Sequence, residues 1–205
     1  MKKFLIVGQG IAGTMLAWSL QRRGAAVHLA DCALPGCSSM AAAGVINPVT
    51  GRRFVRSWRF TEFYPVARSA YRSLEAELGI SIWTDLSILR LLGTPEEAND
   101  WSARCALPGY ADFLSVPADA GHWAAAVKPG FHYGRIQPAA RVNFSVLLPA
   151  FRQKARAEGC FFEKQIDYRE IPQLSAAYDG IIFCEGWRAR ENPFFPDLPW
   201  QTAKG

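Results

Sequence analysis

Residues 4–13 read FLIVGQGIAG, four apolar residues followed by three glycines in a G-x-G-x-x-G pattern. A short apolar run of this kind is typical of a buried parallel strand. Helical spacing of apolar residues follows from Ile11 to Arg23 and ends at Gly24, and residues 27–30 form a second apolar run. A strand, a helix and a strand within roughly thirty residues predict a βαβ unit with a right-handed crossover.

The three glycines stand where a dinucleotide-binding turn needs them, because they follow a strand and open a helix. Gly8 permits the tight turn, Gly10 lets the backbone approach a pyrophosphate, and Gly13 allows close packing of helix on strand. The N–H groups that open the helix, at Ile11 and Ala12, and the positive end of the helix dipole form an anion site. A plain glycine turn is the alternative interpretation.

An acidic residue ends the second predicted strand. Asp31 follows Gly13 by eighteen residues. A carboxylate there can accept hydrogen bonds from the hydroxyls of an adenosine ribose, and its charge disfavours a 2′-phosphate. We therefore expect NADP to be excluded, and we place Asp31 and the adjacent Cys32 in the predicted cofactor site.

Residues 38–48, SSMAAAGVINP, combine small side chains with two hydroxyls soon after this acid. Small side chains let a planar ligand lie against the backbone, and the hydroxyls of Ser38 and Ser39 can bond phosphate oxygens. A surface loop of small residues is the alternative.

The segment resembles the D-amino-acid oxidase, glycine oxidase and sarcosine oxidase group of flavoproteins, in which a Ser/Thr-x-Ala-Ala-Gly stretch runs beside FAD. The resemblance implies FAD as the cofactor and places Ser38 and Ser39 near its pyrophosphate. Asp31 stands where the family usually has Glu, a change that shortens the reach to the ribose. By the same resemblance five residues approach the flavin ring: Ala42, Ala43, Gly44, Val45 and Ile46.

Three later stretches extend the resemblance. Residues 134–138, with a helix expected from about 140 to 158, resemble the family's return from the substrate domain. Ile166 would pass the adenine. Residues 179–187 resemble the strand and Ala-x-Gly turn under the cofactor, with Cys184 and Gly186 at that turn, although Cys184 and its neighbour Glu185 depart from the usual residues.

The predicted fold class is α/β: a Rossmann-like FAD-binding domain, with a parallel sheet and helices, plus part of an antiparallel α+β substrate domain. We assign residues 1–80 and 130–205 to a discontinuous, incomplete FAD/NAD(P)-binding domain. Residues 81–129 form the first part of the substrate domain, because the chain changes character there, with a predicted strand and a helix opened by Pro95. In the family a large C-terminal part completes both domains, so we expect a fragment, truncated or natural, that is itself inactive.

Composition bounds the remaining possibilities. The chain has 205 residues, a formal net charge of +5 and five cysteines without a CxxC pair or a Cys/His cluster. Their odd number predicts reduced thiols in a cytoplasmic protein, and their spacing predicts no metal site. Lys2 and Lys3 before an apolar run imitate a secretory signal, but glycines interrupt the run. No apolar stretch has the length of a membrane span, so we expect no integral membrane protein.

Residues 51–59, GRRFVRSWR, interleave four arginines with aromatic residues. Such a segment can be a solvated surface, can bind RNA through phosphate contacts and stacking, or can hold a substrate carboxylate or an anionic reduced flavin. Arg52 is the catalytic candidate.

These observations predict an FAD-dependent oxidoreductase that oxidises a C–N bond of a small-molecule amino acid or secondary amine. One alternative, from the same family and consistent with the arginine segment, is a flavin-dependent tRNA wobble-uridine modification oxidase. The other is a non-enzymatic dinucleotide-binding module.

Overall fold

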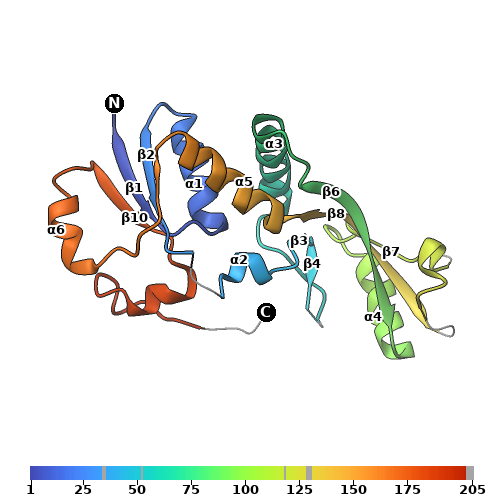
Figure 1. Ribbon diagram of the computed structural model, residues 1–205. Coiled ribbons are helices and arrows are strands. Elements are labelled where there is room, and N and C mark those ends of the chain that lie inside the picture. The colour runs from blue at the N-terminus through green and yellow to red at the C-terminus, as the bar shows by residue number, and fades with distance from the viewer. Residues whose placement is uncertain (34–35, 52, 118, 128–130, 202–205) are drawn as a thin grey trace. The chain divides into compact units, whose positions relative to one another are not determined.

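The computed structural model describes residues 1–33, 36–51, 53–117, 119–127 and 131–201. The chain forms two compact units (Figure 1). Unit 1 comprises Met1–Ala43, Leu78–Ser81 and Asn143–Gly205, and unit 2 comprises Gly44–Glu77 and Ile82–Val142.

A parallel sheet is the centre of unit 1. Its strands are β1 (Lys3–Val7), β2 (Ala26–Ala30), β9 (Phe161–Phe162) and β10 (Gly180–Phe183), in the order β10-β1-β2-β9, and each neighbouring pair is parallel. The chain moves outward from β1 to β2 and β9 and then crosses to β10 on the other side of β1. The carboxyl ends of β1 and β10 therefore flank the topological switch point, where open α/β sheets bind their ligands.

Helices cover both faces of this sheet. On one face α1 (Ile11–Gln21) packs against β1 and β2, and α5 (Phe144–Ala157) packs against α1 and β9. Successive strand residues point to opposite faces, so Leu5 and Val7 are buried on the other face, where Leu174 of α6 (Ile171–Leu174) packs against them. Three short helices complete the unit: α2 (Ser38–Ala41), η2 (Tyr168–Glu170) and η3 (Gly186–Glu191). The predicted Rossmann-like α/β fold is confirmed.

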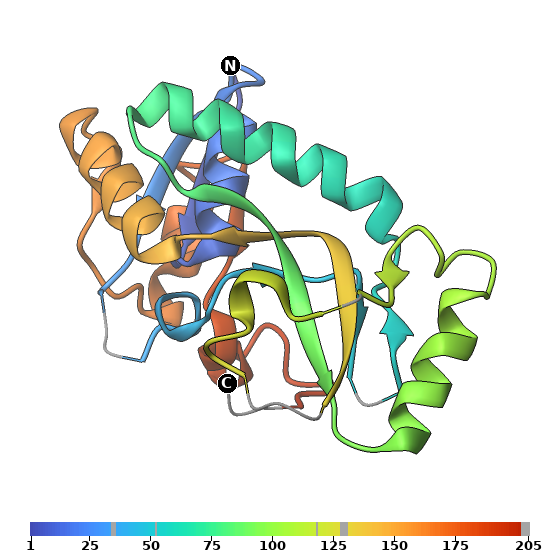
Figure 2. The same cartoon turned by 90° about the vertical axis from the view of Figure 1, so that its right-hand side faces the viewer.

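Unit 2 is built on an antiparallel sheet, which confirms the antiparallel part of the predicted fold class. The strands β6 (Trp83–Leu92) and β8 (His132–Val142), green and gold in Figure 2, pair along their length. Their pairing register shifts between Leu86 and Ile88. Two short strands, β3 (Val45–Ile46) and β7 (Leu114–Ser115), also pair with β8. The remaining elements are β4 (Val49–Thr50), β5 (Val55–Arg56), α3 (Phe60–Leu78), α4 (Pro95–Cys105) and η1 (Gly121–Trp123).

The core of unit 2 forms around Trp101 of α4, whose side chain is fully buried. A Cβ atom at Gly134 of β8 would lie 2.3 Å from the Trp101 ring, so glycine is required where the helix crosses the strand. Helix α4 begins at Pro95 because the Oγ1 of Thr94 accepts from the N–H of Glu97 at 3.1 Å, which satisfies one of the first-turn donors.

One element boundary was predicted wrongly. The helix expected from about residue 140 begins at Phe144, since Ala140 still pairs with Ile46 and Asp85 in the sheet. Burial explains the difference: Ala140 and Val142 are buried, and pairing in β8 satisfies the backbone of this stretch.

The boundaries of the compact units differ from the boundaries of the predicted domains. Residues 131–142 belong to unit 2 because β8 pairs with β6, and residues 44–77 belong to it because Val49, Phe54 and Phe60 enter its core. A compact unit is a packing property, however, and a nucleotide-binding domain is a functional one. The assignment of residues 1–80 and 130–205 to the nucleotide-binding domain and 81–129 to the substrate domain stays a prediction.

Candidate functional site

The glycine turn leads from β1 into α1 and lies against the end of β10. Gly8 has a φ of +99°, and a Cβ atom there would lie 2.3 Å from the carbonyl oxygen of Cys184. A Cβ atom at Gly13 would lie 2.0 Å from the carbonyl oxygen of Gly8. Both positions therefore exclude any side chain, as the sequence pattern predicts.

The N-terminus of α1 offers backbone donors beside this turn. The N–H of Thr14 donates to the carbonyl oxygen of Gly10 at 2.9 Å, which is the first hydrogen bond inside the helix. The N–H groups of Ile11, Ala12 and Gly13 precede it and have no acceptor within the helix. The N–H of Ile11 donates to the Oγ of Ser39 at 3.1 Å, and Gly10 provides no capping side chain. These donors, the helix dipole and the Ser39 hydroxyl form a site suited to an anion.

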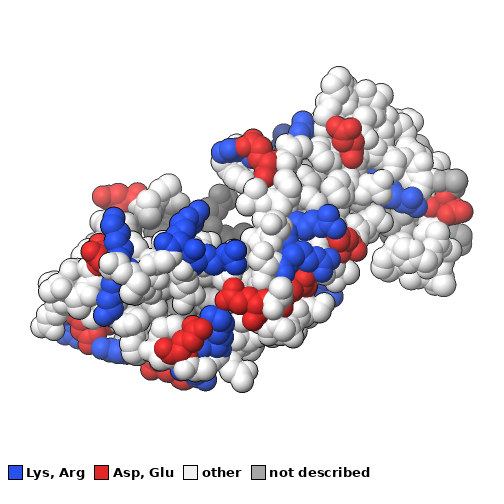
Figure 3. Space-filling model, turned by 90° about the horizontal axis from the view of Figure 1, so that it is seen from above, with Lys and Arg blue, Asp and Glu red and all other residues white. Residues whose placement is uncertain are grey.

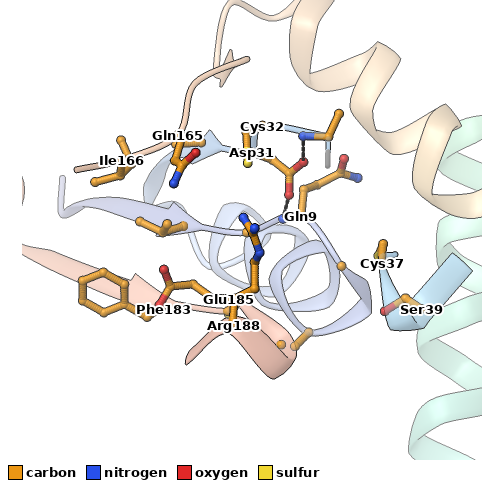
Figure 4. Close-up of a pocket in the computed structure, with 18 of the residues that line it drawn as sticks. Gln9, Asp31, Cys32, Cys37, Ser39, Gln165, Ile166, Phe183, Glu185 and Arg188 are labelled. Carbon is orange, nitrogen blue, oxygen red and sulfur yellow. Dashed lines mark hydrogen bonds between the residues drawn. The ribbon is translucent and has the colours of Figure 1, made fainter. Parts of the chain in front are cut away.

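The Asp31 carboxylate lies next to the turn (Figure 4). Its Oδ2 accepts from the N–H of Gln9 at 2.7 Å, and its Oδ1 accepts from the N–H of Ala33 at 2.7 Å. The Nη2 of Arg152 forms an ion pair with the same Oδ1 at 3.3 Å. A carboxylate has about four acceptor positions, so these three donors leave about one for a sugar hydroxyl.

Gln9 connects the turn to α5. Its side chain is buried, with an exposed fraction of 1%. Its Nε2 donates to the Oγ1 of Thr14 at 3.2 Å and to the carbonyl oxygen of Leu148 at 3.0 Å, and its Oε1 accepts from the Nε of Arg152 at 2.6 Å. The middle residue of the first G-x-G thus holds α5 beside the turn, and Arg152 joins Gln9 to Asp31.

A cavity of about 1220 Å³ opens over these groups within unit 1. Ligand pockets usually measure roughly 300–1,000 Å³, so this cavity can take an extended ligand of dinucleotide size. Its lining includes these residues of the predicted cofactor site: Gly8, Gly10, Ile11, Ala12, Asp31, Cys32, Ser38, Ser39, Ile166, Cys184 and Gly186.

The other predicted site residues lie elsewhere. Gly13 packs behind the turn, and Ala42 and Ala43 follow α2 outside the cavity lining. Gly44, Val45 and Ile46 belong to unit 2, and Arg52 lies outside the described residues. Their predicted place beside a flavin ring stays a prediction.

Residues 3–205 match the family model described as FAD dependent oxidoreductase. The chain belongs to this family. The uncharacterized oxidoreductase YurR of Bacillus subtilis (strain 168) is 29% identical over an alignment of 177 residues, which covers 78% of this chain and 45% of YurR.

Solved structures share the fold. Glycine oxidase from Geobacillus kaustophilus matches with a TM-score of 0.61 and 22% identity, over 80% of this chain and 47% of its own. Iminodiacetate oxidase (IdaA) from Chelativorans sp. BNC1 matches with a TM-score of 0.56 and 22% identity, over 79% of this chain and 47% of its own. The chain thus spans about half the length of the relatives that it matches.

A hydrogen-bond network lies at the end of β10 in this FAD dependent oxidoreductase chain. The sequence patterns did not reveal it. The Tyr168 hydroxyl donates to the Oε1 of Glu185 at 2.9 Å, and Nδ2 of the buried Asn192 donates to its Oε2 at 2.8 Å. Burial and the Glu185 carboxylate raise the pKa of Tyr168 to about 12. Burial and Glu185 also raise the pKa of the Cys184 thiol, which lines the cavity, and so favour its neutral form.

The arginine segment uses several of its side chains in local contacts. The Arg56 guanidinium lies 5.4 Å from the centre of the Phe113 ring. Arg59 pairs with Glu62 and lies over the Trp58 ring, which is 76% exposed. On the face shown in Figure 3, Lys and Arg side chains are interspersed with Asp and Glu. These contacts leave the hypothesis of tRNA binding untested.

Within the ranges that the structure describes, His, Cys, Asp and Glu side chains form no group of three or more able to hold a metal ion. No described helix has both the length and the apolar character needed to cross a membrane. All five cysteines are free.

Proposed function

We propose that the chain binds FAD at the glycine turn and belongs to an oxidoreductase that oxidises the C–N bond of an amino acid or secondary amine. The observation that carries the proposal is the juxtaposition of the Ile11–Gly13 N–H groups, which have no acceptor within α1, with the Asp31 carboxylate, at the switch point of a parallel sheet.

The residues present fit this cofactor. Gly8 and Gly13 admit no Cβ atom, because the carbonyl oxygens of Cys184 and Gly8 lie against them, so the turn keeps a tight, bare backbone. The N–H groups of α1 and the Ser39 hydroxyl would hold the pyrophosphate, and Asp31 would accept from one ribose hydroxyl. Ile166, which lines the same cavity, would lie along the adenine. When bound, FAD would supply the acceptor for a hydride from the carbon beside the substrate nitrogen.

The substrate class rests on the relatives. Glycine oxidase and iminodiacetate oxidase are named for small amines that carry a carboxylate. Together with the family of this chain, these names support an amino acid or a secondary amine as the substrate. Arg52 is proposed to hold the substrate carboxylate, because a guanidinium binds a carboxylate through two parallel hydrogen bonds. The free cysteines support a place in the cytoplasm.

Cofactor identity is tested by titration. The purified chain, freed of nucleotide, is titrated with FAD, FMN and NAD, while an as-isolated sample is denatured and its released cofactor identified by chromatography. We expect FAD to be released and to bind most tightly. Asp31→Asn should weaken FAD binding, because the amide nitrogen presents a donor toward groups that already donate. Preference for another nucleotide, or none bound by the unaltered chain, contradicts the proposal.

Substrate class is tested on the protein encoded by the full reading frame that contains these residues. It is mixed without oxygen with a panel of amino acids and secondary amines, and loss of the visible flavin absorbance is recorded. Bleaching by at least one amine is expected. Bleaching by hydroxy acids alone would contradict the proposed C–N oxidation.

A further inference from the structure

Four cationic side chains line the cavity of unit 1: Arg152, Arg156, Lys164 and Arg188. Three of them are paired with acids: Arg152 with Asp31, Arg156 with Glu163, and Lys164 with Glu170. The guanidinium of Arg188 has no acidic partner among the residues that the structure describes. It lies over the Trp187 ring, 5.5 Å from the centre of that ring.

The acids of the cavity are also engaged with other groups. Asp31 pairs with Arg152, Asp167 with Arg169, and Glu191 with Arg190 at 3.8 Å. Glu185 accepts from Tyr168 and Asn192 through its two oxygens. Arg188 is therefore the cationic side chain of the lining that no ion pair between described residues engages, and its guanidinium is available to an anionic ligand.

Backbone geometry brings this charge to the glycine turn. Gly186 follows β10 with a φ of +60°, and η3 begins there, so the chain turns back at the carboxyl end of the sheet. Arg188 is half-buried in η3 and lines the same cavity as Gly8 and Gly10. Figure 4 shows its side chain extending from η3 toward the turn.

We infer that Arg188 binds the pyrophosphate of the dinucleotide held by the turn. This inference rests on the proposed function. The backbone donors of α1 supply hydrogen bonds and only the partial charge of a helix dipole, whereas a pyrophosphate has two negative charges. A guanidinium supplies a full charge and two parallel donors, and it pairs with phosphate oxygens in a fixed geometry. Arg188 thus adds to the site a charge that the G-x-G-x-x-G turn lacks.

Arg190 provides a matched control in the same short helix. Its guanidinium also lies over the Trp187 ring, at 5.2 Å, but Arg190 pairs with Glu191 and is not part of the cavity lining. A change at Arg190 therefore removes a similar charge and a similar stacking contact from outside the cavity lining, and it frees Glu191 only from an exposed, weak ion pair.

The test compares ligands with and without a pyrophosphate. The folded chain and its Arg188→Met, Arg188→Lys and Arg190→Met variants are titrated with FAD, ADP and adenosine by calorimetry. Arg188→Met should weaken FAD and ADP binding by about ten- to a hundredfold, the effect of losing hydrogen bonds from a charged donor, and should change adenosine binding by less than about twofold. The FAD and ADP affinities of Arg188→Lys should lie between those of Arg188→Met and those of the unaltered chain. The affinities of Arg190→Met should match those of the unaltered chain.

The outcomes separate this inference from the proposed function. Unchanged ADP affinity in Arg188→Met, or an equal loss for adenosine, overturns the role of Arg188 and leaves FAD binding standing. Failure of the unaltered chain to bind FAD or ADP overturns both. If Arg188→Met does not fold, the ADP affinity of Arg188→Lys and the salt dependence of ADP binding to the unaltered chain test the inference instead. An ADP affinity that changes neither in Arg188→Lys nor with added salt overturns the inference.

Discussion

Replacing Gly13 by alanine should weaken FAD binding because the added methyl group has no space. The Cβ atom would lie 2.0 Å from the carbonyl oxygen of Gly8, whereas ordinary van der Waals contact begins at 3.4 Å. The start of α1 must therefore move away from the turn by roughly the difference, 1.4 Å. A shift of this size misplaces the N–H groups that face the anion site.

The size of the effect follows from the hydrogen bonds at risk. A hydrogen bond to a charged group contributes about 1.5–3 kcal/mol. Loss of one such bond to a pyrophosphate raises the Kd for FAD by about ten- to 150-fold. Overpacking should also lower the free energy of unfolding by about 1–3 kcal/mol. Helix propensity alone predicts the opposite sign, since alanine favours a helix over glycine by about 1 kcal/mol.

The assay is calorimetric titration with FAD, with a urea unfolding curve for each variant. Gly93→Ala is the control, because a Cβ atom there would lie 3.7 Å from the Oε2 of Glu97, an ordinary contact. A folded Gly13→Ala protein that binds FAD within about twofold of the unaltered chain, or that is more stable, would refute the packing argument.

Three further predictions follow from other contacts of the described residues. Arg152→Met should lower the free energy of unfolding by about 1–3 kcal/mol, because the buried Oε1 of Gln9 loses its donor. Arg156→Met, on the same helix, should lower it by less than about 1 kcal/mol, since the pair of Arg156 with Glu163 is exposed. Equal urea midpoints for the two variants would contradict this prediction. Burial, and then Lys3, lower the pKa of His28 below its ordinary 6.5, so the fold favours the neutral imidazole; the resulting stability is present above about pH 6.5 and is lost as the pH falls through the lowered pKa. Between about pH 7.5 and about pH 5, the free energy of unfolding in urea should fall in the unaltered chain and should fall less in His28→Gln. The same pH dependence in both proteins would count against this role of His28. Because Arg56 and Arg59 are engaged locally, we expect no tRNA binding even at low salt; salt-dependent binding that disappears when Arg52, Arg53, Arg56 and Arg59 are replaced together would support the tRNA alternative instead.

The local part of the fold could be predicted from the sequence. The strand, turn and helix at residues 4–13 depend on contacts between near neighbours, and the structure places Asp31 beside that turn as expected. The start of α4 at Pro95 was also expected, because proline is favoured at the first position of a helix.

Long-range packing decided the rest. Nothing local to Gln9 or Arg152 indicates that they meet, since 143 residues separate them and only the docking of α5 brings them together. Arg188 likewise faces the turn because β10 pairs with β1, a parallel pairing that joins segments far apart in the chain. The extra length of β8 depends on its partner β6, which residues 140–142 do not reveal by themselves.

The most direct test of the central claim is an amide NMR titration of the isotope-labelled chain with FAD. The account predicts that the largest shift changes fall on the amides of Gly10, Ile11, Ala12 and Gly13, because these N–H groups would donate to the pyrophosphate. Saturating FAD that leaves these four resonances in place, while shifting others, would contradict it.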